Sequence, residues 1–172
     1  MYRDGKGVPQ DDAEAAKWFR KAAEQGETGA QLFLGAMYYY GRGVPQDYAE
    51  TAKWRRLAAE QGDATAQKLL STLYRDGRGV PKDDAEMVKW LRKAAEQGDA
   101  KAQHLLGGAY GTGRGVRQDF IQAHMWLNLA ASHFPSGETR DRSAKLRDNL
   151  AAHMTPAQTA EAQRLAREWK PK

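Results

Sequence analysis

The sequence of 172 residues contains no cysteine, which excludes disulfide bonds, thiolate nucleophiles and zinc–thiolate sites. It also lacks any apolar run approaching the roughly 20 residues that a membrane-spanning helix needs. The opening residues MYRDGKG have no apolar segment of the kind found in secretory signal peptides. We therefore expect a soluble protein without membrane insertion, in either the cytoplasm or the periplasm.

Histidine and serine are also scarce, and neither occurs in a catalytic or metal-binding motif. There is no HExxH motif, and no serine lies in a GxSxG motif. We expect the four histidines to be surface residues: His104, His124, His133 and His153. Acidic pairs such as Asp11-Asp12 precede helical patterns, where negative charge stabilises the helix N-terminus. The sequence therefore predicts no enzyme activity, no metal site and no cofactor.

The charge of the chain does not indicate nucleic-acid binding. The net charge is +5 and the sequence pI is about 9.4. However, lysine and arginine are interspersed with aspartate and glutamate along the whole chain. A nucleic-acid-binding protein is expected to gather its basic residues on one face or stripe. We expect no nucleic-acid partner.

The most informative feature of the sequence is an internal repeat of 36 residues. The stretches GKGVPQD, GRGVPQD, GRGVPKD and GRGVRQD begin at residues 5, 41, 77 and 113. Tryptophan and tyrosine recur in the same register, at Trp18, Trp54, Trp90 and Trp126 and at Tyr2, Tyr38, Tyr74 and Tyr110. Residues 41–76 are identical to residues 77–112 at 23 of 36 positions. Such self-similarity indicates a repeat protein in which each unit packs on its neighbours.

Each repeat contains two helical patterns, here termed helix A and helix B. Helix A, for example AQLFLGAMYYYG, places apolar residues on one face: Ala30, Phe33, Leu34, Met37 and Tyr38. Helix B, for example DYAETAKWRRLAAEQG, begins with Asp47 as N-cap and ends near Gly62. Small residues recur at the positions of Ala30 and Gly35, so we expect neighbouring helices to approach closely there.

The glycine-rich stretch between helix A and helix B could be taken for a phosphate-binding loop. A phosphate loop, however, is expected once, after a strand and with a catalytic set downstream. Here the stretch occurs four times between helical patterns. We interpret it as a bend, in which glycine permits left-handed backbone, valine enters the core and proline prevents the helix from continuing.

The repeated pattern resembles that of the Sel-1-like repeat (SLR) family, which is related to the tetratricopeptide repeats. In the second repeat the matching residues of helix A and the bend are Ala30, Leu34, Gly35, Tyr38, Gly41, Gly43 and Val44. Those of helix B are Lys53, Trp54, Ala58, Ala59 and Gly62. The resemblance implies an all-α fold, a right-handed α-α superhelix (solenoid) of antiparallel helix pairs. The lack of cysteine sets the chain apart from disulfide-bridged secreted members of the family.

The resemblance covers residues 1–133, and the remaining residues 134–172 break the 36-residue period. We expect a helix from about Glu138 to His153 and a second helix after Thr155-Pro156. Because a solenoid must seal the end of its core, we interpret these helices as a two-helix C-terminal cap of the same domain.

The first repeat is shorter than the others at its N-terminal side. Met1-Tyr2 aligns with Met37-Tyr38, so most of its helix A is missing, either because the chain is a fragment of a longer array or because its N-terminus is short. Trp18 and Phe19 should then lack part of their packing partner. We expect an exposed apolar surface there, which would permit weak self-association of an otherwise monomeric chain.

In tetratricopeptide-type arrangements the side of helix A opposite the packed stripe lines a concave groove. In this chain that side changes from repeat to repeat while the packing positions stay the same. The candidate partner-binding residues are Arg3, Leu32, Tyr39, Tyr40, Lys68, Arg75, Lys101 and His104. Tyrosine and arginine are common at energetically important interface positions, which favours the two tyrosines and Arg75.

The function that the resemblance implies is that of a non-catalytic scaffold or adaptor. SLR proteins of bacteria generally act as adaptors in envelope, signalling or secretion assemblies, so we expect a protein or peptide partner in the groove. Two alternatives stay open. Aromatic groove residues could bind cell-wall polysaccharide, and some secreted relatives are associated with β-lactam binding or hydrolysis.

Overall fold

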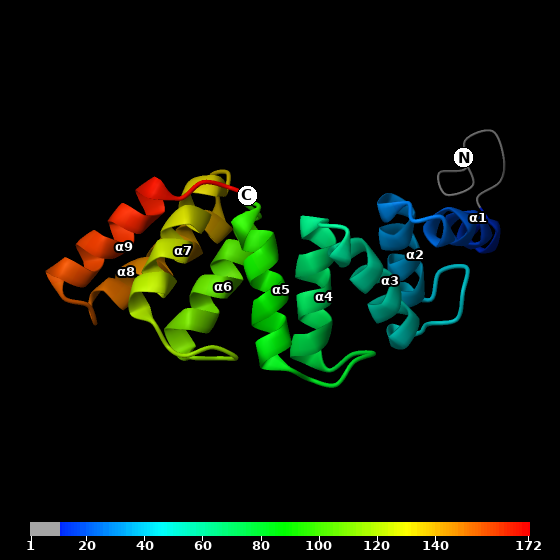
Figure 1. Ribbon diagram of the computed structural model, residues 1–172, viewed down its shortest axis with the longest axis horizontal. Helices are drawn as coiled ribbons and strands as arrows, with labels where there is room; N and C mark the ends of the chain where they lie inside the picture. Colours follow the sequence, from blue (N-terminus) through cyan, green and yellow to red (C-terminus); the bar gives the residue numbers. More distant parts are fainter. Residues whose placement is uncertain (1–10) are drawn as a thin grey trace. The chain divides into compact units, whose positions relative to one another are not determined.

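The computed structural model describes residues 11–172, and all regular structure in this range is α-helical. Figure 1 shows the helices in chain order. The chain divides into two compact units, one ending at Lys82 and the other beginning at Asp83. Arg3, Tyr2 and the first glycine-rich stretch lie outside the described residues.

The boundary between the units falls within the third repeat, between its helix A and its helix B, and the second unit also contains the fourth repeat and the C-terminal segment. The helices of the first unit are α1 (Asp12–Glu24), α2 (Thr28–Tyr40), α3 (Tyr48–Glu60) and α4 (Ala64–Asp76). Those of the second unit are α5 (Asp84–Glu96), α6 (Ala100–Thr112), α7 (Phe120–His133), α8 (Glu138–Ala151) and α9 (Pro156–Glu168). From α1 to α4 and from α5 to α8 consecutive helices pack against one another, and α9 packs on α7, which confirms an all-α helical-repeat solenoid.

The helix ends follow the signals in the sequence. The B helices α1, α3, α5 and α7 begin after an aspartate whose carboxylate accepts hydrogen bonds from backbone amides of the first turn: Asp11, Asp47, Asp83 and Asp119. This N-cap satisfies amides that have no partner within the helix. The A helices α2, α4 and α6 end at a glycine in the left-handed conformation, for example Gly77 with φ of 68°. The expected caps and bends are therefore confirmed.

The second glycine of each bend has a different role from the first. Gly79 lies so close to the first turn of α3 that a Cβ atom at this position would be 1.8 Å from the carbonyl oxygen of Tyr48. Gly43 and Gly115 meet the backbones of Asp12 and Asp84 in the same way, each at 2.0 Å. The bend is thus pressed onto the helix B that precedes it, and no side chain fits between them.

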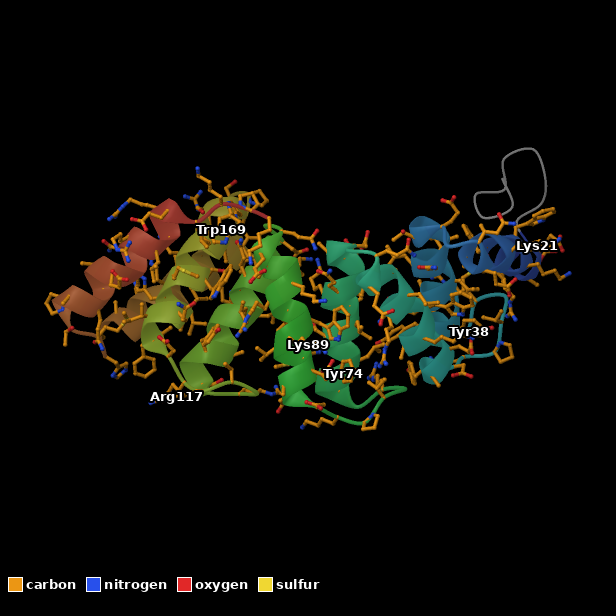
Figure 2. All side chains as sticks on the ribbon, viewed as in Figure 1. Lys21, Tyr38, Tyr74, Lys89, Arg117 and Trp169 are labelled. Atoms are coloured by element: carbon orange, nitrogen blue, oxygen red, sulfur yellow. The ribbon has the colours of Figure 1, made fainter. Side chains whose placement is uncertain are left out.

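The core of the first unit shows how the repeat packs. Ala23, Ala30, Leu34, Tyr38 and Trp54 form one buried cluster, with Val44 of the bend packed against it. The side chains of Tyr38 and its equivalent Tyr74 extend from corresponding positions of α2 and α4 (Figure 2). The small residues of helix A do allow close approach, as expected. A Cβ atom on Gly107 would come 2.7 Å from Cγ of Leu127.

A buried glutamine in each A helix was not anticipated from the sequence. Gln31, Gln67 and Gln103 are at most 3% exposed. Each donates a hydrogen bond from Nε2 to a carbonyl near the end of the preceding helix B, at 3.2, 3.1 and 3.1 Å. These bonds satisfy both buried groups, so each glutamine joins helix A to the helix B of the preceding repeat.

One residue of the expected apolar face of helix A is not buried. Phe33 is 44% exposed, whereas Leu34 and Tyr38 are buried. Phe33 lies toward the edge of the stripe and stacks on Phe19 of α1, with ring centroids 5.1 Å apart. The expectation for Phe33 was therefore wrong, because the spacing rule does not tell a core position from an edge position.

The C-terminal segment forms the two expected helices, which pack on α7. Thr155 and Gln158 make a capping box at the start of α9, and Pro156 is its first residue. After α9, the ring of Trp169 lies edge-on to that of Trp126 of α7, with centroids 6.3 Å apart. The backbone amide of Lys172 then donates to the carbonyl of Glu96. The division at residue 133 and the role of the segment as a cap stay predictions.

Candidate functional site

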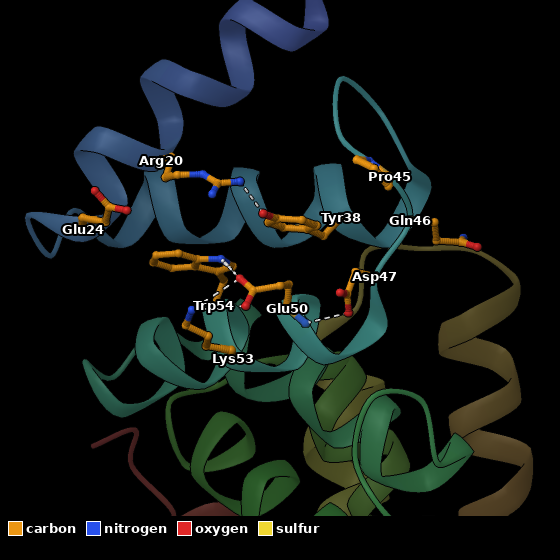
Figure 3. A pocket seen from close by; sticks show the side chains of 9 residues that line it. All are labelled: Arg20, Glu24, Tyr38, Pro45, Gln46, Asp47, Glu50, Lys53 and Trp54. Atoms are coloured by element: carbon orange, nitrogen blue, oxygen red, sulfur yellow. Dashed lines mark hydrogen bonds and ion pairs between the residues drawn. The ribbon is translucent and has the colours of Figure 1, made fainter.

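A polar pocket of about 400 Å³ lies beside the bend between α2 and α3 (Figure 3). Its guanidinium, Arg20 of α1, donates to the hydroxyl of Tyr38. Of its three carboxylates, that of Glu50 accepts hydrogen bonds from Trp54 at 2.9 Å and from Lys53 at 3.2 Å. The same contacts recur in other repeats, as Arg56–Tyr74, Arg92–Tyr110 and Trp90–Glu86. We therefore assign these side chains to the scaffold and not to a repeat-specific site.

A second group of side chains in the first unit is centred on residues that differ between the repeats. We call it the Tyr–Arg cluster, and it consists of Tyr39 and Tyr40 of α2, Tyr48 and Arg55 of α3, and Arg78 of the bend after α4. The ring of Tyr39 is its centre. It lies 5.0 Å from the ring of Tyr40 and 5.3 Å from that of Tyr48, both edge to face. Arg78 donates a hydrogen bond of 2.6 Å to the Tyr39 hydroxyl.

Arg55 is the unusual member of this cluster because it is 5% exposed. Its aliphatic part runs past Gly35, where a Cβ atom would be 3.4 Å from Cγ of Arg55. Its guanidinium lies 4.8 Å from the centre of the Tyr39 ring. The Nε atom of this guanidinium is buried and has no hydrogen-bond partner among the described residues. Burial lowers the pKa of Arg55, and the nearby Tyr39 and Tyr40 hydroxyls oppose this effect.

The predicted residue Arg75 lies at the border of the cluster. Its guanidinium is bound to the adjacent Asp76, with Nε 2.8 Å from Oδ1. This hydrogen bond raises the pKa of Arg75, and the charge interactions with Asp76 and Tyr39 act in the same direction. The structure thus brings three predicted residues together, namely Tyr39, Tyr40 and Arg75.

An apolar pocket of about 300 Å³ adjoins the cluster through Tyr40, which is 65% exposed. Asp12 and Arg42 are its charged lining residues. The rest of the lining comes from α1 and α2: Phe19, Phe33, Ala36, Met37 and Tyr40. We refer to it below as the apolar pocket. An apolar hollow beside exposed polar aromatic and cationic groups is the kind of surface on which protein side chains dock.

The remaining predicted residues are dispersed. Leu32 of α2 and Lys68 of α4 are half-buried, and Lys101 of α6 is exposed. His104 of α6 is half-buried, because α8 of the C-terminal segment covers it, and its Nδ1 lies 2.8 Å from the hydroxyl of Ser143. The expectation that His104 lies on an open face was therefore wrong.

The contact between His104 and Ser143 does not have the features of a catalytic pair. The Ser143 side chain is completely buried, and its hydroxyl donates to the carbonyl of Thr139 at 2.9 Å. A nucleophile needs access to substrate and a base that can take its proton. Within residues 11–172, no group of three or more histidine, aspartate or glutamate side chains could hold a metal ion.

His124 corrects a second expectation, because it is buried and not a surface residue. It lies on α7, is 3% exposed, and its Nδ1 has no partner. The equivalent residues of the other repeats are Ala16, Ala52 and Val88, so the repeat phase predicts burial and the residue type does not. His133 and His153 are exposed, as expected.

The two covered histidines predict that the protein loses stability in mild acid. Burial lowers the pKa of both, with Arg142 acting in the same direction on His104 and Arg147 on His124, where Asp148 opposes it. Below the ordinary histidine pKa of about 6.5, the unfolded chain then binds more protons than the folded one. Between pH 7 and pH 5 the free energy of unfolding should fall by at most about 1.4 kcal/mol per pH unit for each histidine, and the melting temperature should fall with it.

The control for this prediction is His124→Val, which installs the residue found at the equivalent position 88. Differential scanning calorimetry across this pH range should show a flatter dependence for the variant. An unchanged slope would mean that His124 does not carry the effect.

Sequence reasoning missed Arg55, although a signal was present. The positions equivalent to Arg55 are Phe19, Leu91 and Leu127, so three repeats place an apolar residue where one places arginine. A comparison of the core positions between repeats would have marked it. The candidate partner-binding residues all belong to the variable face of helix A, whereas Arg55 belongs to helix B.

The chain matches a known family of repeat proteins, and the matched segments coincide with its repeats. The sequence model described as Sel1 repeat matches residues 1–27, 28–63, 64–99 and 100–133. Among curated proteins, none matches the chain. None of the helices between residues 11 and 172 is long and apolar enough to cross a membrane.

Solved structures give similar folds. A Sel1 repeat protein from Oxalobacter formigenes is 34% identical with a TM-score of 0.76, over 99% of this chain and 70% of that chain. A protective antigen of uropathogenic Escherichia coli that displays an SLR fold is 26% identical with a TM-score of 0.65. That match covers 98% of this chain but 43% of the antigen, so the chain spans less than half of its length. Cysteine rich protein B of Helicobacter pylori, 21% identical over 83% of this chain and 98% of its own, shares the fold with a TM-score of 0.60.

Proposed function

Because this chain belongs to the Sel1 repeat family, we propose that it is a non-catalytic scaffold that binds a protein or peptide segment. Proteins of this family generally mediate protein interactions. The binding surface in this proposal is the variable face of the A helices. In the first unit it comprises Leu32, Tyr39, Tyr40, Lys68 and Arg75, and in the second unit Lys101 with the accessible part of His104. Arg3, the remaining candidate, lies outside the described residues.

The observation that supports this proposal most directly is the Tyr–Arg cluster beside the apolar pocket. The scaffold contacts of Trp54 and Tyr38 recur in the other repeats. The position of Tyr39, by contrast, holds Arg75 and Gly111 in the next two repeats, and that of Tyr40 holds Asp76 and Thr112. Side chains that differ while the scaffold repeats are free to specify a partner, and Tyr40 is well exposed.

Tyr40→Ala is expected to weaken peptide binding without affecting the fold. Its ring touches Tyr39 and Arg42 at the surface, so truncation leaves no buried cavity. We expect the affinity for a peptide selected from a displayed random library to fall about 10-fold or more, measured by calorimetry. The melting temperature should stay nearly the same, as for most surface substitutions.

Arg164→Ala is a suitable control, because within residues 11–172 this exposed arginine of α9 pairs only with carboxylates of its own helix, those of Glu161 and Glu168. It should leave the peptide affinity unchanged. Arg75→Ala should lower the affinity, since Arg75 lies next to Tyr39. A large drop in melting temperature for Tyr40→Ala would show that this side chain supports the fold and not the partner.

Two other functions are tested with the same protein. Cell-wall glycan fragments are the alternative ligands for an exposed aromatic surface, and titration with them in parallel separates a polysaccharide-binding module from a peptide-binding one. A chromogenic β-lactam tests for hydrolysis. Turnover that a substitution of a surface residue abolishes would replace the scaffold proposal with an enzyme.

A further inference from the structure

Among the described residues, neither Arg55 nor Arg78 pairs with a carboxylate: the Nε of Arg55 has no hydrogen-bond partner, and Arg78 contacts tyrosines. In the second unit, Arg114 occupies the position equivalent to Arg78 and pairs with Asp84, at 2.8 Å. In the first unit the residue equivalent to Asp84 is Tyr48. Arg78 therefore stacks on the Tyr48 ring, 5.4 Å from its centre, and donates to Tyr39.

The substitutions that distinguish this repeat thus change its charge in one direction. Tyr48 stands where an aspartate stands in the first and third repeats, and Arg55 stands where leucine or phenylalanine stands elsewhere. One negative charge is lost and one positive charge is gained at the same place. The carboxylate nearby in sequence, Asp76, is already bound to Arg75.

Because Arg55 is buried, the absence of a hydrogen-bond acceptor for its Nε is energetically costly. Arg55 as a whole is 5% exposed and its Nε is buried without a hydrogen-bond partner, whereas a buried charge normally has an ion pair or a full set of hydrogen bonds. The face of the Tyr39 ring supplies part of this stabilisation and supplies no acceptor. Because the side chain is held by packing past Gly35 and by Tyr39, little conformational entropy remains to be lost when a ligand binds.

We propose that Arg55 and Arg78 bind the side-chain carboxylate of an aspartate or glutamate in the partner, and that a bulky apolar side chain beside this residue fills the apolar pocket. The inference rests on the proposed peptide binding and specifies its chemistry. Guanidinium groups hold carboxylates by strong, directional hydrogen bonds, and a site already shielded from water strengthens them. Tyr40 belongs to the Tyr–Arg cluster and also lines the apolar pocket, so one short segment of the partner would reach both.

The test selects peptides that bind the full chain from a random library. Each peptide is joined to its display carrier through the C-terminal end of the peptide, so it has no free terminal carboxylate and only its side chains provide carboxylates. We expect enriched peptides to contain aspartate or glutamate next to leucine, isoleucine, phenylalanine or methionine. Replacing that acidic residue by its amide, in a synthetic peptide with a blocked C-terminus, should lower the affinity roughly 10- to 100-fold.

Arg55→Leu is the matching change in the protein, because leucine occupies the equivalent positions 91 and 127. It should lower the affinity for the acidic peptide by a similar factor and have little effect on the amide version. Its melting temperature should be equal to that of the wild type or higher, since a buried charge is replaced by a packed apolar group. Arg56→Leu, with the same charge change at the exposed neighbouring residue, should leave the affinity nearly unchanged.

The outcomes separate this inference from the function on which it rests. Enriched peptides without an acidic preference, or equal binding of the acid and amide peptides, would overturn the carboxylate site and leave peptide binding intact. No enrichment of any peptide would remove both. Equal binding by Arg55→Leu and the wild type would likewise exclude Arg55 as the anchor.

Discussion

Gly79→Ala is expected to destabilise the first unit by more than about 4 kcal/mol, well above the usual effect of a point substitution. A Cβ atom at position 79 would lie 1.8 Å from the carbonyl oxygen of Tyr48 and 2.7 Å from the amide nitrogen of Ala49. Both are backbone atoms of the first turn of α3, and they cannot move aside as a flexible side chain can. The bend would have to leave the helix on which it rests, with loss of the contacts around it.

Gly77→Ala provides the control, because Gly77 has the same left-handed backbone, with φ of 68° against 69° for Gly79. The nearest atom to a Cβ at position 77 is Cβ of Lys82, at 3.3 Å. This change should therefore cost only the strain of left-handed backbone, about 1–2 kcal/mol. Urea denaturation followed by circular dichroism measures both. Equal midpoints for the two variants would show that the close approach at Gly79 is not what stabilises the bend.

The second large effect is expected for Trp54→Ala. The Trp54 side chain is 5% exposed and packs among Ala23, Ala30, Leu34 and Tyr38. Its removal leaves a cavity and also frees Glu50 from a hydrogen bond. Truncation of a buried tryptophan typically costs about 3–5 kcal/mol, and we expect a loss of unfolding free energy in that range.

Trp18→Ala tests whether the position in the repeat or its surroundings determines this cost. Trp18 occupies the same phase, but it is 53% exposed, with the ammonium of Lys21 4.6 Å from its ring centre. We expect a loss below about 1 kcal/mol. A loss as large as that of Trp54→Ala would mean that Trp18 is covered in solution. Self-association through this exposed surface stays a prediction, and a concentration-dependent melting temperature would reveal it.

The sequence was sufficient to predict the helices because a repeat supplies its own evidence. The aspartate N-caps, the glycine at the end of helix A and the Thr155-Pro156 start of the last helix each have a local cause, and each was confirmed. These features depend on neighbouring residues in the chain. The 36-residue period then fixed which helices form pairs, since equivalent residues must have equivalent surroundings.

The features that were missed depend on contacts between residues far apart in the sequence. His104 belongs to a helix face predicted to be open, yet α8, more than 30 residues later, lies over it. Arg55 and His124 occupy core phases with polar side chains, and rules based on residue type place such residues at the surface. For both, the phase in the repeat was a better guide to burial than the chemistry of the side chain.

The pressing of each bend onto an earlier helix also constrains how such a chain can change its length. Gly43, Gly79 and Gly115 each meet the backbone of the residue 31 positions before them, at Asp12, Tyr48 and Asp84. An insertion or deletion between the two contact points moves the glycine off the helix and brings a larger residue onto it. The contact between bend and helix therefore keeps the length of the repeat constant. The array can gain or lose residues readily only in whole repeats.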